Sequence, residues 1–120
     1  MPFDSKFVFV AAMDVDPEKE DLFNEIYDTE HIPNLLGVDG VISVSRSKRV
    51  PTNLIIGGET VAVGSDEPLY IAYYELENLD VINSDGWAAA VDKGRWTDEV
   101  RPYTHNKHLA IHEVIDPNKY

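Results

Sequence analysis

The run KFVFVAAM, residues 6–13, predicts a β-strand that has no polar face from Phe7 onwards. Phenylalanine and valine favour strands, and acidic turn residues bound the run at both ends. Successive side chains of a strand point to opposite faces, and both faces are apolar here: Phe7, Phe9 and Ala11 on one, Val8, Val10 and Ala12 on the other. Such a strand has to be covered on both sides, so its sheet needs a layer on each face.

The first half of the chain continues with a helix and a second strand. The sequence Asp16-Pro17-Glu18 predicts a helix start with Asp16 as the N-cap and a proline in the first turn. Apolar residues then recur at helical spacing until Pro33, which is expected to end or kink the helix near His31 because proline lacks a backbone donor. Residues 41–50 (VISVSRSKRV) alternate apolar and polar side chains and predict a strand near a sheet edge.

The second half predicts, in order, a hairpin, a strand, a short helix and a last strand, over residues 51–66, 69–76, 87–91 and 103–115. Gly57-Gly58 marks the turn of the hairpin. Ser84 or Asp85 is expected to cap the short helix, and Gly94 to end it before a further turn over 97–100.

This order of elements is that of the ferredoxin-like βαββαβ plan, in which two helices cover one face of an antiparallel sheet. The 120 residues suffice for one domain, so we expect a single α+β domain over residues 1–120, with residues 51–66 as a hairpin insertion between the second and third strands. The first, third and fourth strands look apolar on both faces. A second copy packed sheet against sheet would cover the remaining face, so the sequence predicts a homodimer.

The formal net charge of −12 excludes several classes of partner. A surface this acidic repels phosphate backbones and anionic lipids, so we expect neither a nucleic-acid nor a membrane partner. The chain has no cysteine, which excludes disulfides, thiolate nucleophiles and sulfur metal ligands. Its start lacks the basic region of a signal peptide, and a cytoplasmic location is therefore the expectation.

Two passages of the sequence are similar to a known family. The passage EHIPNLLGVDGVISVSR, residues 30–46, resembles the His-x-Pro … Gly-Val passage of the EthD-like branch of the dimeric α+β barrel superfamily, and GWAAAVDKGRW…RPY, residues 86–103, resembles its second-helix region. The resemblance covers nearly the whole chain apart from the hairpin, and it implies a dimer with a small-molecule pocket in each subunit. The superfamily includes cofactor-free monooxygenases, polyketide cyclases and dehydratases, lactone isomerases and haem enzymes, so it does not specify a reaction.

His31 is the first catalytic candidate. It lies on the helical row of Phe23 and Tyr27 that is expected to face the sheet. An imidazole titrates near neutral pH and can transfer a proton without a cofactor, although a structural histidine bonded to a backbone carbonyl is the alternative. Tyr27 and either Tyr73 or Tyr74 can complete a polar cluster, since a tyrosine hydroxyl can hold a substrate carbonyl; of the two neighbours we assign Tyr73 to the site.

The candidate substrate-binding residues are apolar, aromatic or basic: Phe23, Trp87, Val91, Trp96, Arg101 and His105. The two tryptophans flank the second helix and offer flat faces to an aromatic ligand, unless they only fill the core. Arg101 can hold an anion, or it can pair with one of the many acidic residues.

A metal site formed by the C-terminal histidines is geometrically poor. Within a strand, His108 and His112 would lie roughly 13 Å apart at about 3.3 Å per residue. His105 would point to the opposite face from both, where it alone can reach the pocket. No phosphate-binding or dinucleotide-binding glycine motif occurs either, so we expect no metal and no cofactor.

The leading hypothesis is a cofactor-independent enzyme that acts on a small, apolar, aromatic or polyketide-like molecule by acid/base chemistry, as a lyase or dehydratase, a cyclase or an isomerase. His31 would be its acid/base group and a tyrosine its polar partner. One alternative is a cofactor-free monooxygenase, in which the substrate anion itself reacts with oxygen. The other is a non-catalytic accessory or ligand-binding protein of a degradation pathway.

Overall fold

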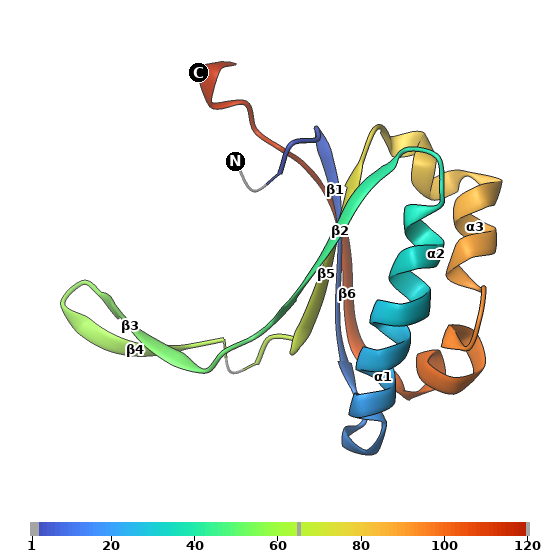
Figure 1. Cartoon of the computed structure of the whole chain (residues 1–120). Coiled ribbons are helices and arrows are strands. Elements are labelled where there is room, and N and C mark those ends of the chain that lie inside the picture. Colours follow the sequence, from blue (N-terminus) through green and yellow to red (C-terminus); the bar gives the residue numbers. More distant parts are fainter. Residues whose placement is uncertain (1–2, 65, 120) are drawn as a thin grey trace.

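The computed structural model describes residues 3–64 and 66–119 and shows a four-stranded sheet with helices packed on one face (Figure 1). The strand order is β2-β5-β1-β6 with antiparallel neighbours, and the strands are β1 (Phe7–Val15), β2 (Val41–Lys48), β5 (Tyr70–Leu76) and β6 (Thr104–Glu113). The first and third strands of the βαββαβ plan lie in the centre, as in ferredoxin-like folds. The predicted α+β fold, with both helices on one face of an antiparallel sheet, is confirmed.

The first helical segment changes its winding along its length. It consists of a 3₁₀ turn, two α-helical stretches and a π-turn between them: η1 (Pro17–Lys19), α1 (Glu20–Ile26), η2 (Tyr27–His31) and α2 (Ile32–Leu36). The start was predicted correctly, but Asp16 makes no capping hydrogen bond, and its carboxylate lies 3.3 Å from Nδ1 of His105 instead. Of the two expected effects of Pro33, an end of the helix near His31 is wrong, because the helix passes Pro33 and ends at Leu36 with Gly37 as its C-cap. The regular α-helical winding is nevertheless interrupted at the expected place, by the π-turn Tyr27–His31.

The π-turn explains how the helix tolerates Pro33. In a regular α-helix the proline ring would clash with the carbonyl of Thr29, four residues earlier. In the π-turn the N–H of Ile32 donates to the carbonyl of Tyr27, five residues earlier, so the helix is wider just before the proline. The helix therefore continues, and both ends of the π-turn, Tyr27 and His31, remain buried.

The second helical segment repeats this device. Its elements are η3 (Leu79–Asn83), α3 (Asp85–Val91), η4 (Trp96–Val100) and η5 (Arg101–Tyr103), and a last 3₁₀ turn, η6 (Pro117–Lys119), follows β6. The predicted cap of α3 is confirmed, because the Ser84 hydroxyl accepts a hydrogen bond of 3.1 Å from the N–H of Trp87. In η4, the second π-turn, the N–H of Arg101 donates to the carbonyl of Trp96, and Pro102 comes next. None of the helices in the described residues is long and apolar enough to cross a membrane.

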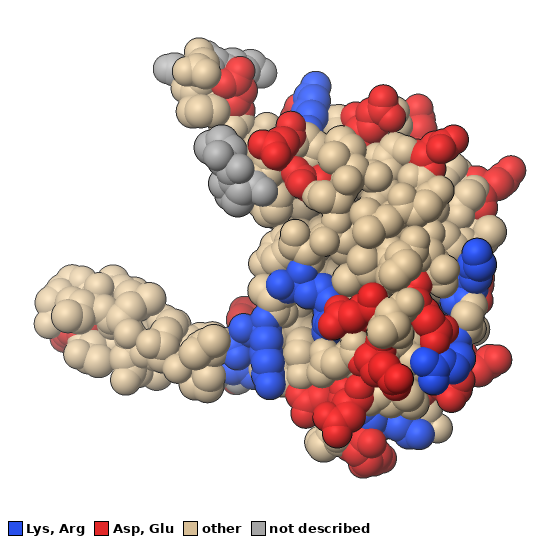
Figure 2. Space-filling view, in the orientation of Figure 1, with Lys and Arg blue, Asp and Glu red and all other residues tan. Residues whose placement is uncertain are grey.

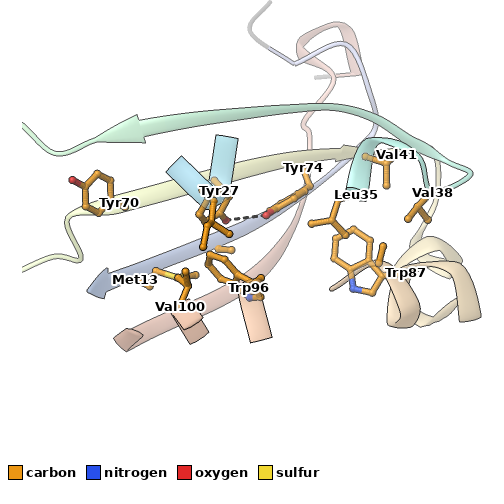
Figure 3. Packing of buried hydrophobic residues seen from close by; sticks show 14 of the residues in the cluster. Met13, Tyr27, Leu35, Val38, Val41, Tyr70, Tyr74, Trp87, Trp96 and Val100 are labelled. Carbon is orange, nitrogen blue, oxygen red and sulfur yellow. Dashed lines mark hydrogen bonds between the residues drawn. The ribbon is translucent and has the colours of Figure 1, made fainter. Parts of the chain in front are cut away.

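The core lies between the helices and the sheet and is rich in aromatic side chains (Figure 3). Four of its side chains, from both helical segments and from β5, are completely buried: Phe23, Ile26, Leu76 and Val100. Full burial of one such side chain contributes about 1.5–3 kcal/mol. This layer is therefore the main source of stability in the described fold.

The other face of the sheet has no described helix on it (Figure 1). The pairing places Tyr73 beside Val10 and Ile71 beside Ala12 on this face, so the two central strands are apolar on both faces, as predicted. The same prediction is wrong for β6, whose residues are almost all exposed and which carries three histidines, His105, His108 and His112, on this face. We refer to it below as the open face.

The insertion forms the predicted hairpin, with strands β3 (Thr52–Ile56) and β4 (Glu59–Val63). Gly57 and Gly58 join them with φ angles of 60° and 83°, which suit the tight turn that matches the twist of a hairpin and that glycine adopts without strain. The hairpin projects from the sheet and is exposed along nearly its whole length (Figure 1).

Candidate functional site

A cavity of about 150 Å³ lies between the helices and strands β1, β5 and β6. Six residues that the sequence assigned to the site line this cavity: Tyr27, His31, Trp87, Val91, Trp96 and Arg101. A larger hollow of about 520 Å³ lies between α2 and α3, but small residues such as Gly37 and Gly86 line it, and His31 does not. The smaller cavity is the candidate site, because it contains the buried aromatic and titratable side chains.

His31 lies in the cavity wall with only 5% of its surface exposed. Its ring stacks on Trp96, with the ring centroids 4.1 Å apart, and meets the ring of Tyr27 edge-on at 5.2 Å. Nδ1 is buried without a hydrogen-bond partner among the described residues, so nothing supports the alternative of an imidazole held by a backbone carbonyl. Burial and, secondarily, the positive charge of Arg101 lower the pKa of His31 from 6.5 to about 4. The imidazole is therefore neutral near pH 7 and can accept a proton.

The hydroxyls of Tyr27 and Tyr74 form a hydrogen bond of 2.9 Å beside the cavity (Figure 3). Burial raises the pKa of Tyr27 to about 12 and that of Tyr74 well above 10, so both hydroxyls are protonated at neutral pH. Two hydroxyls carry two protons, and the bond between them uses only one. The pair can therefore donate a hydrogen bond to a carbonyl or enolate oxygen in the cavity.

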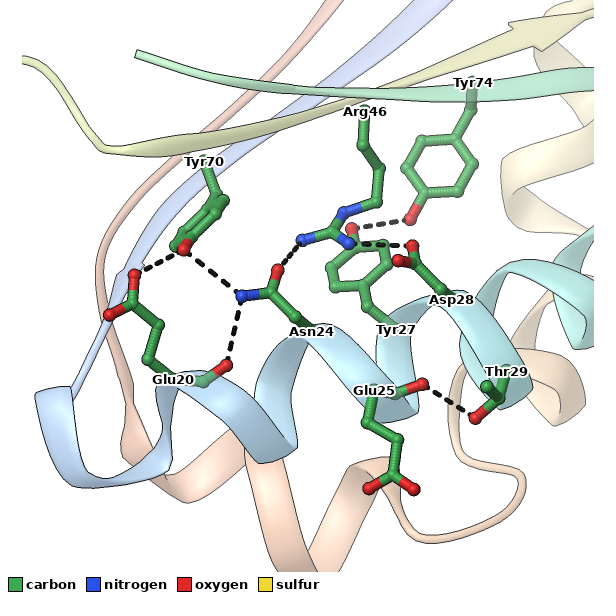
Figure 4. A network of polar contacts seen from close by, with 9 residues as sticks. All are labelled: Glu20, Asn24, Glu25, Tyr27, Asp28, Thr29, Arg46, Tyr70 and Tyr74. Carbon is green, nitrogen blue, oxygen red and sulfur yellow. Dashed lines mark hydrogen bonds and ion pairs between the residues drawn. The ribbon is translucent and has the colours of Figure 1, made fainter. Parts of the chain in front are cut away.

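Arg46 of β2 supports this tyrosine pair from outside the cavity (Figure 4). Its guanidinium lies over the ring of Tyr27, 4.5 Å from the centroid, and donates to Asp28 at 2.7 Å and to Asn24 at 2.6 Å. A cation over a tyrosine face is attractive, and the two hydrogen bonds tie the helical segment to the sheet. This role of Arg46 was not predicted from the sequence. The available signal was the alternation in β2, which places Arg46 on the same face as the apolar Val44.

Glu30 joins the two π-turns. Its carboxylate accepts hydrogen bonds from the backbone N–H of Arg95 at 3.0 Å and from Nε of Arg95 at 2.6 Å, and these bonds lower the pKa of Glu30. Gly94 permits this approach, since its φ is 75° and a Cβ there would lie 2.6 Å from Oε1 of Glu30. Glu30 thus holds the turn that carries Trp96 against the turn that carries His31.

Two aromatic residues that the sequence assigned to the site lie outside the cavity. Phe23 is completely buried in the core, where its ring packs against Tyr27 with the centroids 5.3 Å apart. Tyr73 points to the open face, and its neighbour Tyr74 takes the place assigned to it. Because β5 is apolar on both faces, alternation alone did not decide between them. Glu75, two residues from Tyr73, was the available sign of the less apolar face.

His105 does not reach the cavity, because β6 contains a bulge. Between His108 and His105, β6 has one residue more than the paired stretch of β1. Asn106 is part of the bulge, with a φ of 51° and a 3.0 Å hydrogen bond to Asp14. The extra residue puts His105 on the same face as His108, away from the cavity, whereas Lys107 lies in the cavity wall by regular alternation with Leu109. The prediction that these two histidines lie on opposite faces is therefore wrong.

The remaining histidines lie where the sequence placed them. His108 pairs with Ala12 and His112 with Val8, so both lie on the open face. Within residues 3–64 and 66–119, no group of three histidine, cysteine, aspartate or glutamate side chains is arranged so that it could hold a metal ion.

Comparisons with known proteins support the fold. No protein-family model matches the chain, and neither does any curated protein. Among solved structures, an ethyl tert-butyl ether D (EthD) family protein from Bacillus halodurans C-125 shares 16% identity with a TM-score of 0.59, over 91% of this chain and 99% of that one. The haem-degrading protein MhuD from Mycobacterium tuberculosis, with two haems bound in its active site, shares 14% identity with a TM-score of 0.59, over 92% and 96%. The predicted resemblance to dimeric α+β barrel proteins is thus confirmed, and at these identities it shows the fold alone.

Proposed function

We propose that the chain is a cofactor-independent enzyme that acts on a small, largely apolar, aromatic or polyketide-like molecule by proton transfer. The observation that carries the proposal is His31, which is buried and neutral in the wall of an aromatic cavity and whose Nδ1 has no hydrogen-bond partner among the described residues. A buried polar atom without a partner costs about 1–3 kcal/mol. A ligand in the cavity that forms a hydrogen bond with Nδ1 of His31 would remove this cost, so its binding is favoured.

The side chains support elimination, cyclisation or isomerisation. The neutral imidazole of His31 removes a proton from a carbon atom next to a substrate carbonyl, and the Tyr27–Tyr74 pair donates a hydrogen bond to the developing oxyanion. The imidazolium then returns the proton to another carbon atom or to a leaving hydroxyl, which departs as water. His31 thus both accepts and returns the proton, and the tyrosine pair stays protonated because the pKa of Tyr27 is about 12.

The test is the turnover of His31 variants on a panel of small aromatic and polyketide-like carbonyl compounds, without added metal or flavin. General acid/base catalysis is typically worth about 10²–10⁴-fold in rate, so His31→Ala should lower turnover at least about a hundredfold. His31→Gln should retain much of the binding but lose the rate, since an amide cannot shuttle a proton. Circular dichroism of both variants serves as the control for folding. Wild-type turnover in both would make His31 a structural residue.

The same panel separates the two alternatives from the proposal. Oxygen uptake that accompanies turnover would favour a cofactor-free monooxygenase. Binding without any turnover across the panel would favour an accessory or ligand-binding protein of a degradation pathway.

The haem of MhuD does not fit the cavity as it stands. A tetrapyrrole is several times larger than a single aromatic ring, and a cavity of about 150 Å³ holds roughly one such ring. The imidazole in the cavity wall is also stacked flat against Trp96. The proposed reaction therefore does not involve haem.

The proposal includes a homodimer that covers the open face. Ile71, Val10 and Tyr73 are only half-buried there, and the hairpin projects on the side of the sheet away from the helices (Figures 1 and 2). Light scattering at micromolar concentration should give twice the 13.5 kDa of one chain. Ile71→Asp should shift the mass towards one chain, because it places a charge in the apolar contact, whereas Ala88→Asp on the exposed side of α3 should not. A monomeric wild-type protein would contradict the dimer.

A further inference from the structure

The charged residues that line the cavity are all positive. The chain has 22 acidic and 10 basic residues, and acidic side chains are spread over its surface (Figure 2). The cavity nevertheless has Arg101 and Lys107 in its wall, and no aspartate or glutamate is among the described residues that line it. In a protein with this excess of acid, a cavity that has only cations in its wall is a feature that the fold alone does not require.

Arg101 is only partly engaged by the protein. Its Nη2 donates to the backbone carbonyl of Val91 at 2.8 Å and lies 2.8 Å from the carboxylate of Asp92. Asp92 is 61% exposed, and ion pairs of this kind at the surface contribute little. Neither Nη1 nor Nε has a partner in the part of the chain that the structure describes. The backbone contact therefore orients the guanidinium and leaves donors for a ligand.

Lys107 lies in the cavity wall because it alternates with Leu109 on the same face of β6. No described acidic residue lies within ion-pair distance of its ammonium group. A bulge that turns one side chain out of the regular alternation is a device often found beside binding sites. Here the bulge at Asn106 turns His105 away from this face and leaves Lys107 in place.

Apart from these cations and the polar groups of His31 and the two tyrosines, the wall is apolar, and the space that it encloses is close in size to a single ring. Phe9, Met13, Leu109 and the tryptophans surround about 150 Å³, roughly the volume of an apolar cavity that accepts benzene. Leu109 is 60% exposed, so the β6 side of the cavity, which also carries Lys107, opens towards solvent. A ligand that fits has a flat apolar body and a negative group at its outer end.

We infer that the cavity binds a single-ring aromatic carboxylate, with its ring among the aromatic side chains and its carboxylate on Arg101 and Lys107. A guanidinium and an ammonium group both form charge-assisted hydrogen bonds with carboxylates. This inference rests on the proposed function and names its substrate class. It makes Arg101 and Lys107 substrate-binding residues, and it sets the ring of the substrate beside His31.

The experiment compares benzoate with benzamide, a neutral molecule of nearly the same shape, by titrating each into the protein at pH 7 and following tryptophan fluorescence. Benzoate should bind at least about tenfold more tightly, since hydrogen bonds to charged groups are stronger than neutral ones. Arg101→Gln should weaken benzoate binding by about ten- to a hundredfold and Lys107→Gln by less, because an exposed ammonium is more strongly hydrated. Both variants should bind benzamide like the wild type.

Lys48→Gln is the matched control, since it removes one positive charge from β2, the opposite edge strand of the sheet. It should leave benzoate binding unchanged. Equal binding of benzoate and benzamide, or an equal loss in Lys48→Gln and Arg101→Gln, would overturn the inference. The titration needs no turnover, so its outcome is independent of the His31 test: failure of that test removes the proposed reaction and leaves the carboxylate site.

Discussion

The two π-turns, Tyr27–His31 and Trp96–Val100, have the same backbone conformation and the same sequence pattern. Each begins with a buried aromatic residue, has a glutamate at its fourth position, and is followed by one residue and a proline. In each, the N–H just after the turn donates to the carbonyl five residues earlier. The local cause is the same in both, because a proline in the helix disrupts the regular bonding of the preceding turn.

The side chains at equivalent positions differ in their chemistry. The first turn begins with Tyr27, which has a hydroxyl bonded to Tyr74, and ends with His31. The second begins with Trp96 and ends with Val100, both buried and neither titratable near neutral pH. The turns meet where Trp96 stacks on His31, so the second turn provides an apolar wall for the polar groups of the first. The backbone of the π-turn thus determines where the side chains lie, and the identity of the side chains determines which turn can take part in chemistry.

The largest effect that we expect from this difference is a pH dependence of stability. Unfolded His31 binds a proton with a pKa of 6.5, whereas burial lowers this pKa to about 4 in the folded state. Between these values the unfolded state binds more protons, so the free energy of unfolding rises with pH. The contribution of neutral His31 is fully present above pH 6.5 and is lost as pH falls towards 4. The loss corresponds to about 3 kcal/mol and can be measured by urea unfolding between pH 4 and pH 7.5.

His31→Val provides the control for this prediction, because it gives the first turn the residue that ends the second. The carboxylates of the protein titrate in both proteins, so the difference between the two curves isolates His31. Between pH 7.5 and pH 4 the free energy of unfolding of the variant should fall by about 3 kcal/mol less than that of the wild type. If both proteins lose the same free energy of unfolding between pH 7.5 and pH 4, the imidazole is not held neutral by burial.

A smaller effect is expected from the hydroxyl that distinguishes Tyr27 from Trp96. Tyr74→Phe leaves the hydroxyl of Tyr27 buried without its partner, which should cost about 1–3 kcal/mol in the free energy of unfolding. Replacing both tyrosines by phenylalanine removes donor and acceptor together and should cost less than the sum of the two single changes. A double-mutant cycle by urea unfolding measures this coupling. Additive losses would mean that the hydrogen bond contributes nothing to stability.

The fold was largely predictable because its signals are local. Strand and helix periodicities gave the order of the elements, and Ser84 and Gly57-Gly58 marked a helix cap and a hairpin turn that the structure confirms. The continuation of the helix through Pro33 was not predictable from the rule that proline ends a helix. A π-turn satisfies the backbone in another way, and the packing of buried Tyr27 and His31 favours its formation.

The site was predicted in part, and two of the three misplaced residues share one cause. Helical spacing placed Tyr27 and His31 on the inner face, and the structure brings Trp96 and Arg101 to the same cavity. Phe23 also lies on the inner face but is buried in the core, whereas Tyr73 and His105 are both on strands. A shift of one residue moves a strand side chain to the other face. In β5 both faces are apolar, and in β6 a bulge interrupts the alternation, so neither shift could be predicted from the sequence.

The sequence by itself determined the antiparallel α+β plan, the aromatic inner face of the first helix and the histidine within it, since each depends on residues close together in the chain. Only the tertiary structure decided that Trp96 stacks on His31, that Tyr74 bonds to Tyr27 and that Lys107 joins Arg101 in one cavity wall. The first two contacts join residues more than 40 positions apart in the chain, and the geometry of all three follows from strand register and from the packing of the two π-turns. Alternation and helical spacing describe one element at a time, and the chemistry of this cavity arises where several elements meet.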